Sequence, residues 1–300
     1  MIVTFGSINV DLIYLVNEIP QAGQTVLARG SRTEPGGKGA NQALAAARDG
    51  ADVVMIGAVG NDAMAPIALQ NLESEVDISR VVRSNEPTGS AAIIIDADGR
   101  NMIAVAAGAN LAAQSDGVED ELLRNASYVL MQMENDAVQI ENLIRRVSNH
   151  PAKSILNLAP AYRLDRDLLS LVDIVIVNED EAEALSGWLG CEPSARSLSE
   201  ALNTGVLRTM GGEGAEAFIN GEKVTVPALR VDAVDTTAAG DCFVGVLASA
   251  LDRGLLLDAA MRRAAKAAAI VCSRPGSQSS IPDNGETDSW TWENQGQSPA

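Results

Sequence analysis

Histidine is almost absent from this 300-residue sequence, whose single copy, His150, follows a helical pattern and precedes Pro151. Hydrolases with a serine–histidine or cysteine–histidine pair need an imidazole beside the nucleophile. A histidine-rich metal site needs several such rings. The one loop-like histidine therefore disfavours such a hydrolase and excludes a metal site of this kind.

Cysteine and long apolar runs are scarce as well. Cys191, Cys242 and Cys272 are odd in number and far apart, which indicates neither a disulfide framework nor a CxxC metal site. No stretch of about 20 apolar residues is free of charge, so we expect no transmembrane helix. The opening residues, MIVTF, are typical of a strand rather than of a signal peptide, and we expect a cytoplasmic protein.

Positive charge is the third deficit, because 22 lysines and arginines face 40 acidic residues and the formal net charge is −18. Nucleic acids and anionic membranes both require a basic surface, so we exclude them as partners. An anionic ligand is still compatible with this charge, provided that backbone amides at helix N-termini supply local positive potential.

What the sequence does contain is an alternation of apolar runs and helical patterns. Apolar strands separated by helices are typical of a parallel sheet covered on both faces. We therefore predict an α/β fold with a doubly wound, mostly parallel sheet. The expected strands are residues 2–5, 52–59, 128–132, 153–158, 173–178 and 205–210, and the expected helices are 39–49, 62–75, 136–148, 179–187, 195–203, 238–253 and 255–272.

Two segments, about 11–34 and 88–108, interrupt this alternation. Their pattern is typical of half-exposed antiparallel strands, and Asp98-Gly99 favours a tight turn. We expect a small β-sheet that projects from the body as a lid, which would exclude water from a reaction.

The end of the sequence differs in character from the rest. Residues 283–300 are polar and show no helical or strand period, so we expect a loose tail after one domain at 1–282. Trp290 and Trp292 could attach this tail to the body or to a neighbouring subunit, and the sequence does not choose between them.

The segment EPGGKGAN, residues 34–41, has the glycines of a ligand-binding loop. A Walker-type phosphate loop requires G-x-x-x-x-G-K-[ST], but here Gly39 follows the lysine and Arg32 replaces the first glycine. The glycines still permit close backbone approach, with Lys38 and Asn41 as donors. A plain turn before a helix and a ligand loop are equally favoured at this point.

The segment at 231–254 places small residues before an amphipathic helix, with Asp241 in its first turn. Uncovered amides and the helix dipole form an anion site there, and a carboxylate within it can accept a proton from a hydroxyl that attacks phosphorus. In the alternative, Asp235 or Thr237 caps the helix and Asp241 only favours its dipole.

Two further segments have a dual interpretation. In NEDEAE, residues 178–183, Asn178 and Glu181 have the spacing of a capping box, yet carboxylates after a strand could also hold Mg²⁺ through waters. In RTMGGEGAEAF, residues 208–218, three glycines suit a crossing over a flat ligand. The absence of G-x-G-x-x-G disfavours a nicotinamide dinucleotide fold.

Taken in order, these segments resemble the signature segments of the ribokinase-like (PfkB) carbohydrate kinases. The resemblance covers about residues 1–282, and it implies an ATP-dependent sugar or nucleoside kinase with a doubly wound body and a β-lid through which two subunits often pair. The family segments are GSINVDL (6–12), GGKGANQA (36–43), NEDEAE (178–183) and VDTTAAGDCFVGVL (234–247). Segments similar to the ribokinases of this family are AGAN (107–110), LMQME (130–134), LNLAPA (156–161) and RPGSQSSIP (274–282).

The resemblance implies a role for each matched position. Asp241 is the implied base for the acceptor hydroxyl, and Asn178 with Glu181 is the implied element that organises Mg²⁺ and the phosphates of ATP. The implied anion hole is formed by the amides of Ala238, Ala239 and Gly240. The implied nucleotide loop is Thr209, Met210, Gly211, Gly212, Glu213 and Gly214. The implied sugar ligands are Asn9, Asp11, Gly37, Lys38, Asn41, Glu134 and Asp241.

The resemblance also implies a monovalent-cation site, through which K⁺ would fix the anion-hole loop, so we expect activation by K⁺. Its positions here are Asp235, Thr237, Val271, Arg274, Gly276 and Ser280. Two departures from the family pattern are AAGD in place of GAGD, and Ala265 with Lys266 where a polar residue often faces the adenine.

The composition of the two lid segments restricts the class of molecule that can accept the phosphoryl group. Only Arg29, Arg32 and Arg100 are basic there, which disfavours a sugar phosphate, and Tyr14 is the lone aromatic residue, which disfavours a nucleoside. We therefore expect phosphorylation of the 5-hydroxyl of D-ribose, with 2-deoxyribose, fructose or a similar sugar as the alternative. A sugar sensor without catalysis is disfavoured because the implied catalytic residues are present.

Overall fold

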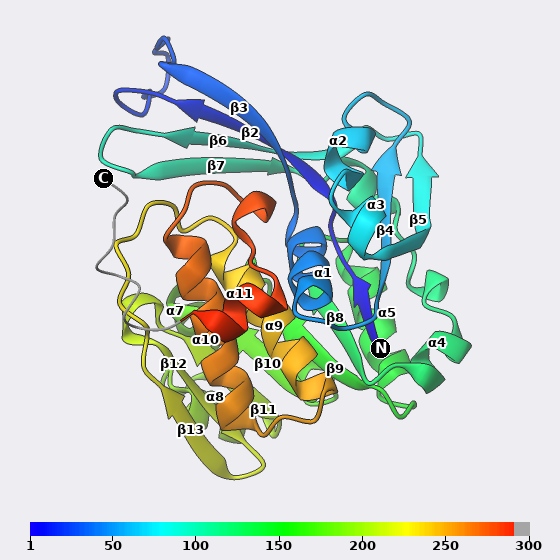
Figure 1. Ribbon diagram of the computed structural model, residues 1–300. Coiled ribbons are helices and arrows are strands. Elements are labelled where there is room, and N and C mark those ends of the chain that lie inside the picture. The colour runs from blue at the N-terminus through cyan, green and yellow to red at the C-terminus, as the bar shows by residue number, and fades with distance from the viewer. Residues whose placement is uncertain (291–300) are drawn as a thin grey trace.

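The computed structural model describes residues 1–290, which form two β-sheets and the helices around them. The large sheet has nine strands in the order β13-β12-β11-β10-β9-β8-β1-β4-β5 (Figure 1). Its strands are β1 (Ile2–Phe5), β4 (Val53–Gly60), β5 (Asp77–Ser84), β8 (Tyr128–Gln132), β9 (Lys153–Asn157), β10 (Ile174–Val177), β11 (Gly205–Thr209), β12 (Ala215–Ile219) and β13 (Glu222–Val226).

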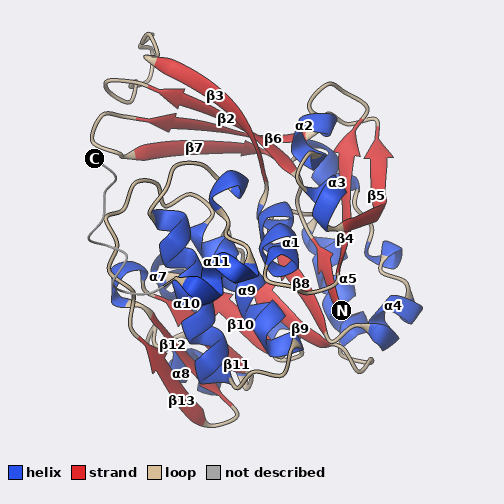
Figure 2. Ribbon diagram, in the orientation of Figure 1, coloured by secondary structure: helices blue, strands red, loops and turns tan. Residues whose placement is uncertain are grey.

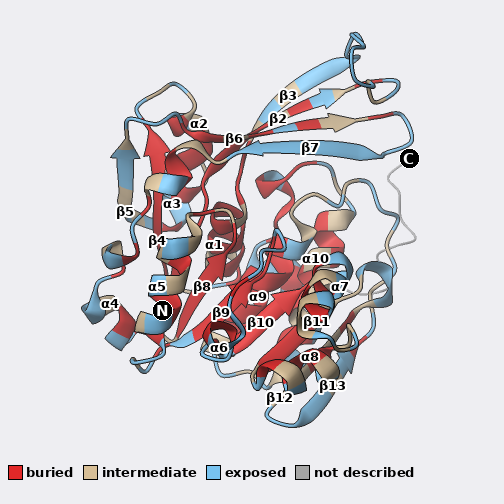
Figure 3. Cartoon of the chain, turned by 180° about the vertical axis from the view of Figure 1, so that it is seen from behind, coloured by how far each residue is buried: buried red, intermediate tan, exposed pale blue. Residues whose placement is uncertain are grey.

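Seven of these strands, from β5 through β11, pair in parallel, and β12 and β13 complete the sheet antiparallel. The predicted doubly wound sheet and its six apolar strands are confirmed within a residue or two of their ends. The sequence did not predict β5, because its segment DISRVVRS is largely exposed at the sheet edge and lacks a continuous apolar run (Figure 3).

Helices cover both faces of the large sheet, and each face has its own hydrophobic cluster (Figure 2). Successive strand residues point to opposite faces, so Ile2 packs with α1, α9 and α10, whereas Val3 packs with α5 to α8. The helices are α1 (Lys38–Arg48), α2 (Ala65–Leu69), α3 (Leu72–Glu75), α4 (Asp120–Asn125), α5 (Ala137–Val147), α6 (Arg166–Leu169), α7 (Glu179–Leu189), α8 (Ala195–Leu202), α9 (Ala239–Asp252), α10 (Leu257–Cys272) and α11 (Asn284–Ser289). The helix expected at 62–75 is divided into α2 and α3.

The predicted lid is a four-stranded sheet in the order β3-β2-β6-β7 that projects from the body (Figure 1). Its strands are β2 (Asn9–Leu15), β3 (Gly30–Gly36), β6 (Gly89–Ile95) and β7 (Asn101–Ala106). The outer pairs are antiparallel, but the central pair β2–β6 is parallel, so the expectation of antiparallel strands is wrong there. Both central strands leave the body in the same direction because α1 to α3 and the strands β4 and β5 lie between the two lid segments in sequence.

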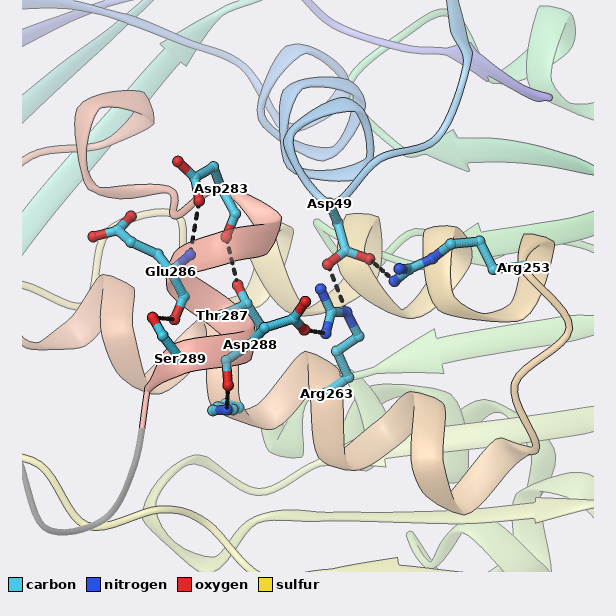
Figure 4. Close-up of polar contacts among 9 residues, drawn as sticks. Asp49, Arg253, Arg263, Asp283, Glu286, Thr287, Asp288 and Ser289 are labelled. Carbon is cyan, nitrogen blue, oxygen red and sulfur yellow. Dashed lines mark hydrogen bonds and ion pairs between the residues drawn. The ribbon is translucent and has the colours of Figure 1, made fainter.

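The expectation of a loose tail over 283–300 is wrong for its first part, because Asn284–Ser289 form α11 (Figure 4). The Asp283 carboxylate accepts a hydrogen bond from the Glu286 amide at 2.7 Å and caps the helix. Glu286 pairs with Arg274 at 2.9 Å, and Asp288 pairs with Arg263 of α10. Charged contacts rather than an apolar face hold α11, so hydrophobic periodicity could not reveal it. Trp290 ends the described residues, and Trp292 lies outside them.

A buried carboxylate joins helix α1 to helices α9 and α10. Asp49, at the end of α1, is 1% exposed and accepts from Arg253 at 2.5 Å and from Arg263 at 2.7 Å (Figure 4). Two cations therefore compensate one buried charge, and the pairs tie α1 to the end of α9 and to α10. Removal of the carboxylate would leave Arg253 without this counter-charge and Arg263 with only its exposed partner Asp288.

We predict that Asp49→Ala lowers the free energy of unfolding by about 3–5 kcal/mol, because breaking a buried ion pair leaves unpaired charge behind. Urea unfolding of the two proteins measures the difference. Asp258→Ala is the matched control, since Asp258 pairs with Arg262 on an exposed helix surface and its removal should leave the unfolding midpoint unchanged. A loss below about 1 kcal/mol for Asp49→Ala would show that the cluster does not join the helices.

Candidate active site

The start of α9 is uncapped. Its N-cap residue, Ala238, has a left-handed backbone with φ of 61°, and no side chain accepts a hydrogen bond from the first turn. The capping alternative is therefore wrong for both candidates. The Asp235 carboxylate instead accepts from the Thr237 amide at 3.0 Å, within the loop that precedes the helix. The first-turn amides of this 14-residue helix stay open to a ligand.

One of the three predicted anion-hole amides is already used. The Ala239 amide donates to the Thr236 carbonyl at 3.2 Å. Within residues 1–290, the amides of Ala238, Gly240 and Asp241 have no hydrogen-bond partner. Gly240 presents no side chain, and an added Cβ there would meet nothing within 4 Å. The open amides and the helix dipole make this point suitable for an anion.

Two hollows meet at the uncapped helix start. The inner cavity, of about 220 Å³, is lined by Asp241, Lys38, Glu181 and Asn178 among others. The outer cleft measures about 800 Å³. Both are lined by Asn178, Thr209, Thr236 and Gly240. The structure thus brings the carboxylate and the lysine into the small compartment, and the open amide of Gly240 lies where that compartment meets the large one.

The Asp241 side chain is held by two amides from α1. Asn41 Nδ2 donates to Oδ2 at 3.0 Å, and Gln42 Nε2 donates to Oδ1 at 3.1 Å. Gln42 in turn contacts Asn157 at 3.0 Å and accepts from Gln132 at 2.7 Å. Each carboxylate oxygen has a fixed donor, so the group keeps one orientation toward the cavity.

Gln42, Asn157 and Gln132 were not identified from the sequence. Gln42 and Gln132 are fully buried, and Asn157 is 8% exposed. The available signal was a glutamine inside the alanine-rich segment ANQALAAA, because a polar residue on a buried helix face requires hydrogen-bond partners.

The residues of the implied sugar site gather around the start of α1. Gly37, with φ of 93°, turns the chain into the helix and lets it pack against the backbone of residues 7–9. Glu134 Oε2 accepts from the Lys38 amide at 3.2 Å and from the Ser7 hydroxyl at 2.6 Å. The charge of Asp241, opposed by burial, raises the pKa of Lys38, which therefore stays a cation.

Asn9 and Asp11 complete this group from the lid strand β2. Asn9 is 2% exposed and accepts from Asn110 at 2.6 Å, which fixes its amide orientation. Burial raises the pKa of Asp11 to about 7, with repulsion from Glu134, Asp241 and Glu34 adding to the shift and Lys38 opposing it. Four carboxylates, those of Asp11, Glu134, Asp241 and Glu181, thus surround the single ammonium group of Lys38, and of these only Asp241 and Glu181 line the inner cavity itself.

Asn178 and Glu181 form the capping box of α7. The Asn178 side chain accepts from the Glu181 amide, and Glu181 Oε2 accepts from the Asn178 amide, both at 2.8 Å. Burial raises the pKa of Glu181. The two residues can form the capping box and still contact a ligand, because one Glu181 oxygen and the Asn178 Nδ2 have no partner within residues 1–290. In that part of the chain, no group of three or more acidic, cysteine or histidine side chains could hold a metal directly.

The outer cleft has a largely apolar lining. Ala265, Ala268 and Ala269 of α10 line it, as do the glycines of the short turn 211–213. Lys266 points elsewhere and donates to the Asp288 carbonyl at 3.1 Å. Of the predicted nucleotide loop, Thr209, Gly211, Gly212 and Gly214 line the cleft, whereas Met210 and Glu213 do not.

The six residues of the implied cation site are brought together beside α9. Gly276 donates its amide to Asp235 Oδ2 at 3.3 Å, and the Arg274 amide donates to the Val271 carbonyl at 3.3 Å. Arg274 Nε donates to the Ser280 carbonyl at 2.9 Å. Thr237 adjoins them through its hydrogen bond to Asp235. A seventh residue, which the sequence analysis did not identify, also reaches this site. It is Arg32 of the lid, which pairs with Asp235 at 3.2 Å.

Comparison with known proteins gives a consistent result. The sequence model of the pfkB family carbohydrate kinases matches residues 1–284. The chain is 36% identical to a ribokinase of Staphylococcus aureus, over 94% of this chain and 96% of that protein. It is 35% identical to a deoxyribokinase of Salmonella typhi, over 94% and 95%. Its fold is similar to Arabidopsis thaliana ribokinase complexed with ribose and ATP, with a TM-score of 0.85, 30% identity and coverage of 95% and 96%.

The raised pKa of Asp11 predicts a pH-dependent loss of stability. The folded pKa of about 7 lies above the unfolded value of 3.8, so the folded state binds an extra proton between these values. This contribution is complete below pH 3.8 and is lost as the pH rises through 7. Asp11→Asn removes the buried charge, and its gain in unfolding free energy should be about 2–3 kcal/mol larger at pH 8 than at pH 5.

Urea unfolding at both pH values measures this difference. Asp98→Asn, on the exposed lid turn, is the matched control and should show no such change between pH 5 and pH 8. An equal effect of Asp11→Asn at the two pH values would contradict the raised pKa.

Proposed function

The chain belongs to the pfkB family of carbohydrate kinases, and on this premise we propose that it transfers the γ-phosphoryl group of ATP to the 5-hydroxyl of D-ribose. The observation that carries the proposal is the position of Asp241. Its carboxylate lines the small inner cavity next to Gly240, which lines both this cavity and the nucleotide-sized cleft, and it lies beside amides that have no partner within residues 1–290.

In the proposed reaction, Asp241 accepts the proton of the ribose hydroxyl as its oxygen attacks the γ-phosphorus. The bond between that oxygen and phosphorus forms while the bond to the ADP oxygen breaks. Charge on the transferring group is stabilised by the amides of Ala238, Gly240 and Asp241, and by the Lys38 ammonium. Catalysis of phosphoryl transfer consists mainly of such positioning and charge stabilisation. The two amides that hold Asp241 keep its oxygens directed at the acceptor.

The outer cleft supports the assignment of ATP. Its volume of about 800 Å³ is within the usual range for a site that takes a ligand of this size. The alanines of α10 leave room for a flat base against the glycines at 211, 212 and 214. The triphosphate would then extend past Thr209 and Asn178 toward the open end of α9.

We include Mg²⁺ in the proposal because Glu181 lines the inner cavity and one of its oxygens has no partner within residues 1–290. With no three-carboxylate cluster in the described residues, Glu181 would hold the ion through water, and the phosphates would supply the other ligands. Bound there, Mg²⁺ supplies charge neutralisation between the phosphates. Asn178 and the capping box fix the position of Glu181.

The sugar would bind beside the inner cavity, between Lys38 and Asp241, which line it, and the neighbouring residues of α1 and the lid. Its hydroxyls would donate to Asp11 and Glu134 and accept from Lys38 and Asn41. Asn9 belongs to the same set, and Gly37 lets the ligand approach the backbone. 2-Deoxyribose is the second candidate, because the chain is about as similar to a deoxyribokinase as to a ribokinase.

K⁺ fits this site less well than the sequence implies. Asp235 is the only carboxylate of the implied set, and its Oδ2 already receives Arg32 and the Gly276 amide. The Ser280 carbonyl is occupied by Arg274. A guanidinium about 5 Å from a bound K⁺ would oppose it by about 3 kcal/mol at an effective dielectric constant of about 20. We therefore route no step through K⁺.

The proposal extends to assembly and location. Strand β7 is exposed along its length, with Met102, Ile103 and Val105 each about half exposed, and it supports pairing of two chains through the lid. A cytoplasmic location is included because the reaction consumes ATP. Within residues 1–290, no helix has the length and apolar character needed to cross a membrane.

ADP release measured over a panel of sugars tests the function directly. We expect the highest kcat/KM with D-ribose, followed by 2-deoxyribose, because the two carboxylates and two donors of the implied sugar site can bind several hydroxyls. Fructose should be slower. Release of ADP with none of the sugars would refute the kinase assignment, and a preference for 2-deoxyribose would transfer it to the second candidate.

Asp241→Asn tests the proposed base. The substitution keeps the size of the side chain and removes the proton acceptor, so kcat should fall by roughly 10²–10⁴-fold while the KM for ribose changes little. The ADP-release assay gives both constants. Asp167→Asn, on the short surface helix α6, is the matched control and should retain full activity. A variant at position 241 with nearly normal kcat would remove Asp241 from the mechanism.

A further inference from the structure

Arg32 extends from lid strand β3 to the loop before the catalytic helix. Its Nη2 lies 3.2 Å from Asp235 Oδ2, and its Nε lies 2.7 Å from Glu34 Oε1 on the same strand. The other Glu34 oxygen accepts from the Ser277 amide at 3.0 Å. Two neighbouring lid residues therefore contact both loops, 231–238 and 273–280, that surround the implied cation site. Asp235 and Glu34 are largely shielded from solvent, with side chains 14% and 19% exposed.

Asp235 connects this contact to the open helix start. Its Oδ1 accepts from the Thr237 amide at 3.0 Å, and Thr237 immediately precedes Ala238, whose left-handed backbone leaves the first-turn amides uncovered. Oδ2 also accepts from the Gly276 amide at 3.3 Å. A positive charge that fixes Asp235 consequently fixes the backbone that presents the amides of Gly240 and Asp241.

We propose that Arg32 is a positioning residue that takes the place of a monovalent cation, so that the lid itself supplies the charge that holds the anion-hole loop. The inference rests on the proposed kinase function and on the contacts of Asp235. Its Oδ2 already pairs with Arg32, so this carboxylate oxygen is not free to bind a dissolved cation. Arg32 is tethered to the lid, so its charge is present at Asp235 without any dissolved ion. The enzyme is then active without K⁺.

Arg32 also makes the anion hole depend on the position of the lid. Glu34 orients the guanidinium and fastens the lid to the Ser277 amide, and both residues lie two to four positions before the segment GGKGAN that approaches the sugar. Lid placement over the sugar and placement of Arg32 on Asp235 are consequently the same event. The loop is held in its active form when the acceptor site is covered.

The test compares the unaltered protein, Arg32→Gln and Arg32→Lys in KCl, NaCl and choline chloride at one ionic strength. For the unaltered protein we expect kcat values that agree within about twofold among the salts. Arg32→Gln should lose about tenfold in kcat in choline chloride and regain most of it in KCl, with the KM for ribose little changed. Arg32→Lys keeps the charge and should stay insensitive to K⁺. Arg100→Gln is the matched control, because Arg100 lies in the turn between β6 and β7 and β7 is at the opposite edge of the lid sheet from β3. This variant should behave as the unaltered protein.

Thermal unfolding in the same salts gives a readout that does not depend on activity. KCl should raise the melting temperature of Arg32→Gln by about 2–4 °C more than choline chloride does, and should not do so for the unaltered protein, because a ligand stabilises only a site that binds it. Marked stimulation and stabilisation of the unaltered protein by K⁺ would overturn the inference, as would an Arg32→Gln variant with normal kcat in choline chloride. If no sugar is phosphorylated in any salt, the proposed function fails, whereas the melting series still decides the role of Arg32. Should Arg32→Gln not fold, the K⁺ response of the unaltered protein and of Arg32→Lys decides it.

Discussion

The structure depends most on the uncapped start of α9. Helix N-termini are normally completed by a side chain, and here the first-turn amides of Gly240 and Asp241 are left open over two hollows. Such an arrangement needs support from elsewhere. Asp235 fixes the preceding loop, and Asn41 with Gln42 fixes the first carboxylate of the helix. The fold places these supports within reach by packing α1 against α9 and by returning the chain from α10 to the same loop.

The surroundings of Lys38 lower the stability of the folded protein. Asp11, Glu134, Asp241 and Glu181 share the surroundings of a single lysine, and burial raises the pKa of Asp11 and of Glu181. Carboxylates that repel one another without ligand are suited to a ligand rich in hydroxyl donors, whose hydrogen bonds offset the repulsion. The net charge of −18 is therefore no obstacle to binding a nucleotide, since the open amides at the start of α9 and the Lys38 ammonium supply local positive potential at the phosphate end.

Local patterns in the sequence were sufficient for the sheet, the lid and most of the site, because apolar runs report burial and the ordered motifs identified Lys38, Asn178, Glu181 and Asp241. Contacts between segments distant in sequence were not accessible in this way. The Gln42 network and the Arg32–Asp235 pair join residues 90 or more positions apart, and single-sequence periodicity contains no record of such partners. Helix α11 was missed for a related reason, since ion pairs to α10 rather than an apolar stripe stabilise it. The parallel register of β2 and β6 likewise follows from where the chain re-enters the lid, which no strand pattern specifies.

That parallel register determines how the lid can move. In the centre of the lid, β2 and β6 are hydrogen-bonded neighbours, yet each is anchored separately to the body at its own end. Neither hairpin can peel away without breaking the ladder along its full length. We therefore expect the four strands to move together as one plate when the sugar enters, rather than to open by the unzipping of an edge.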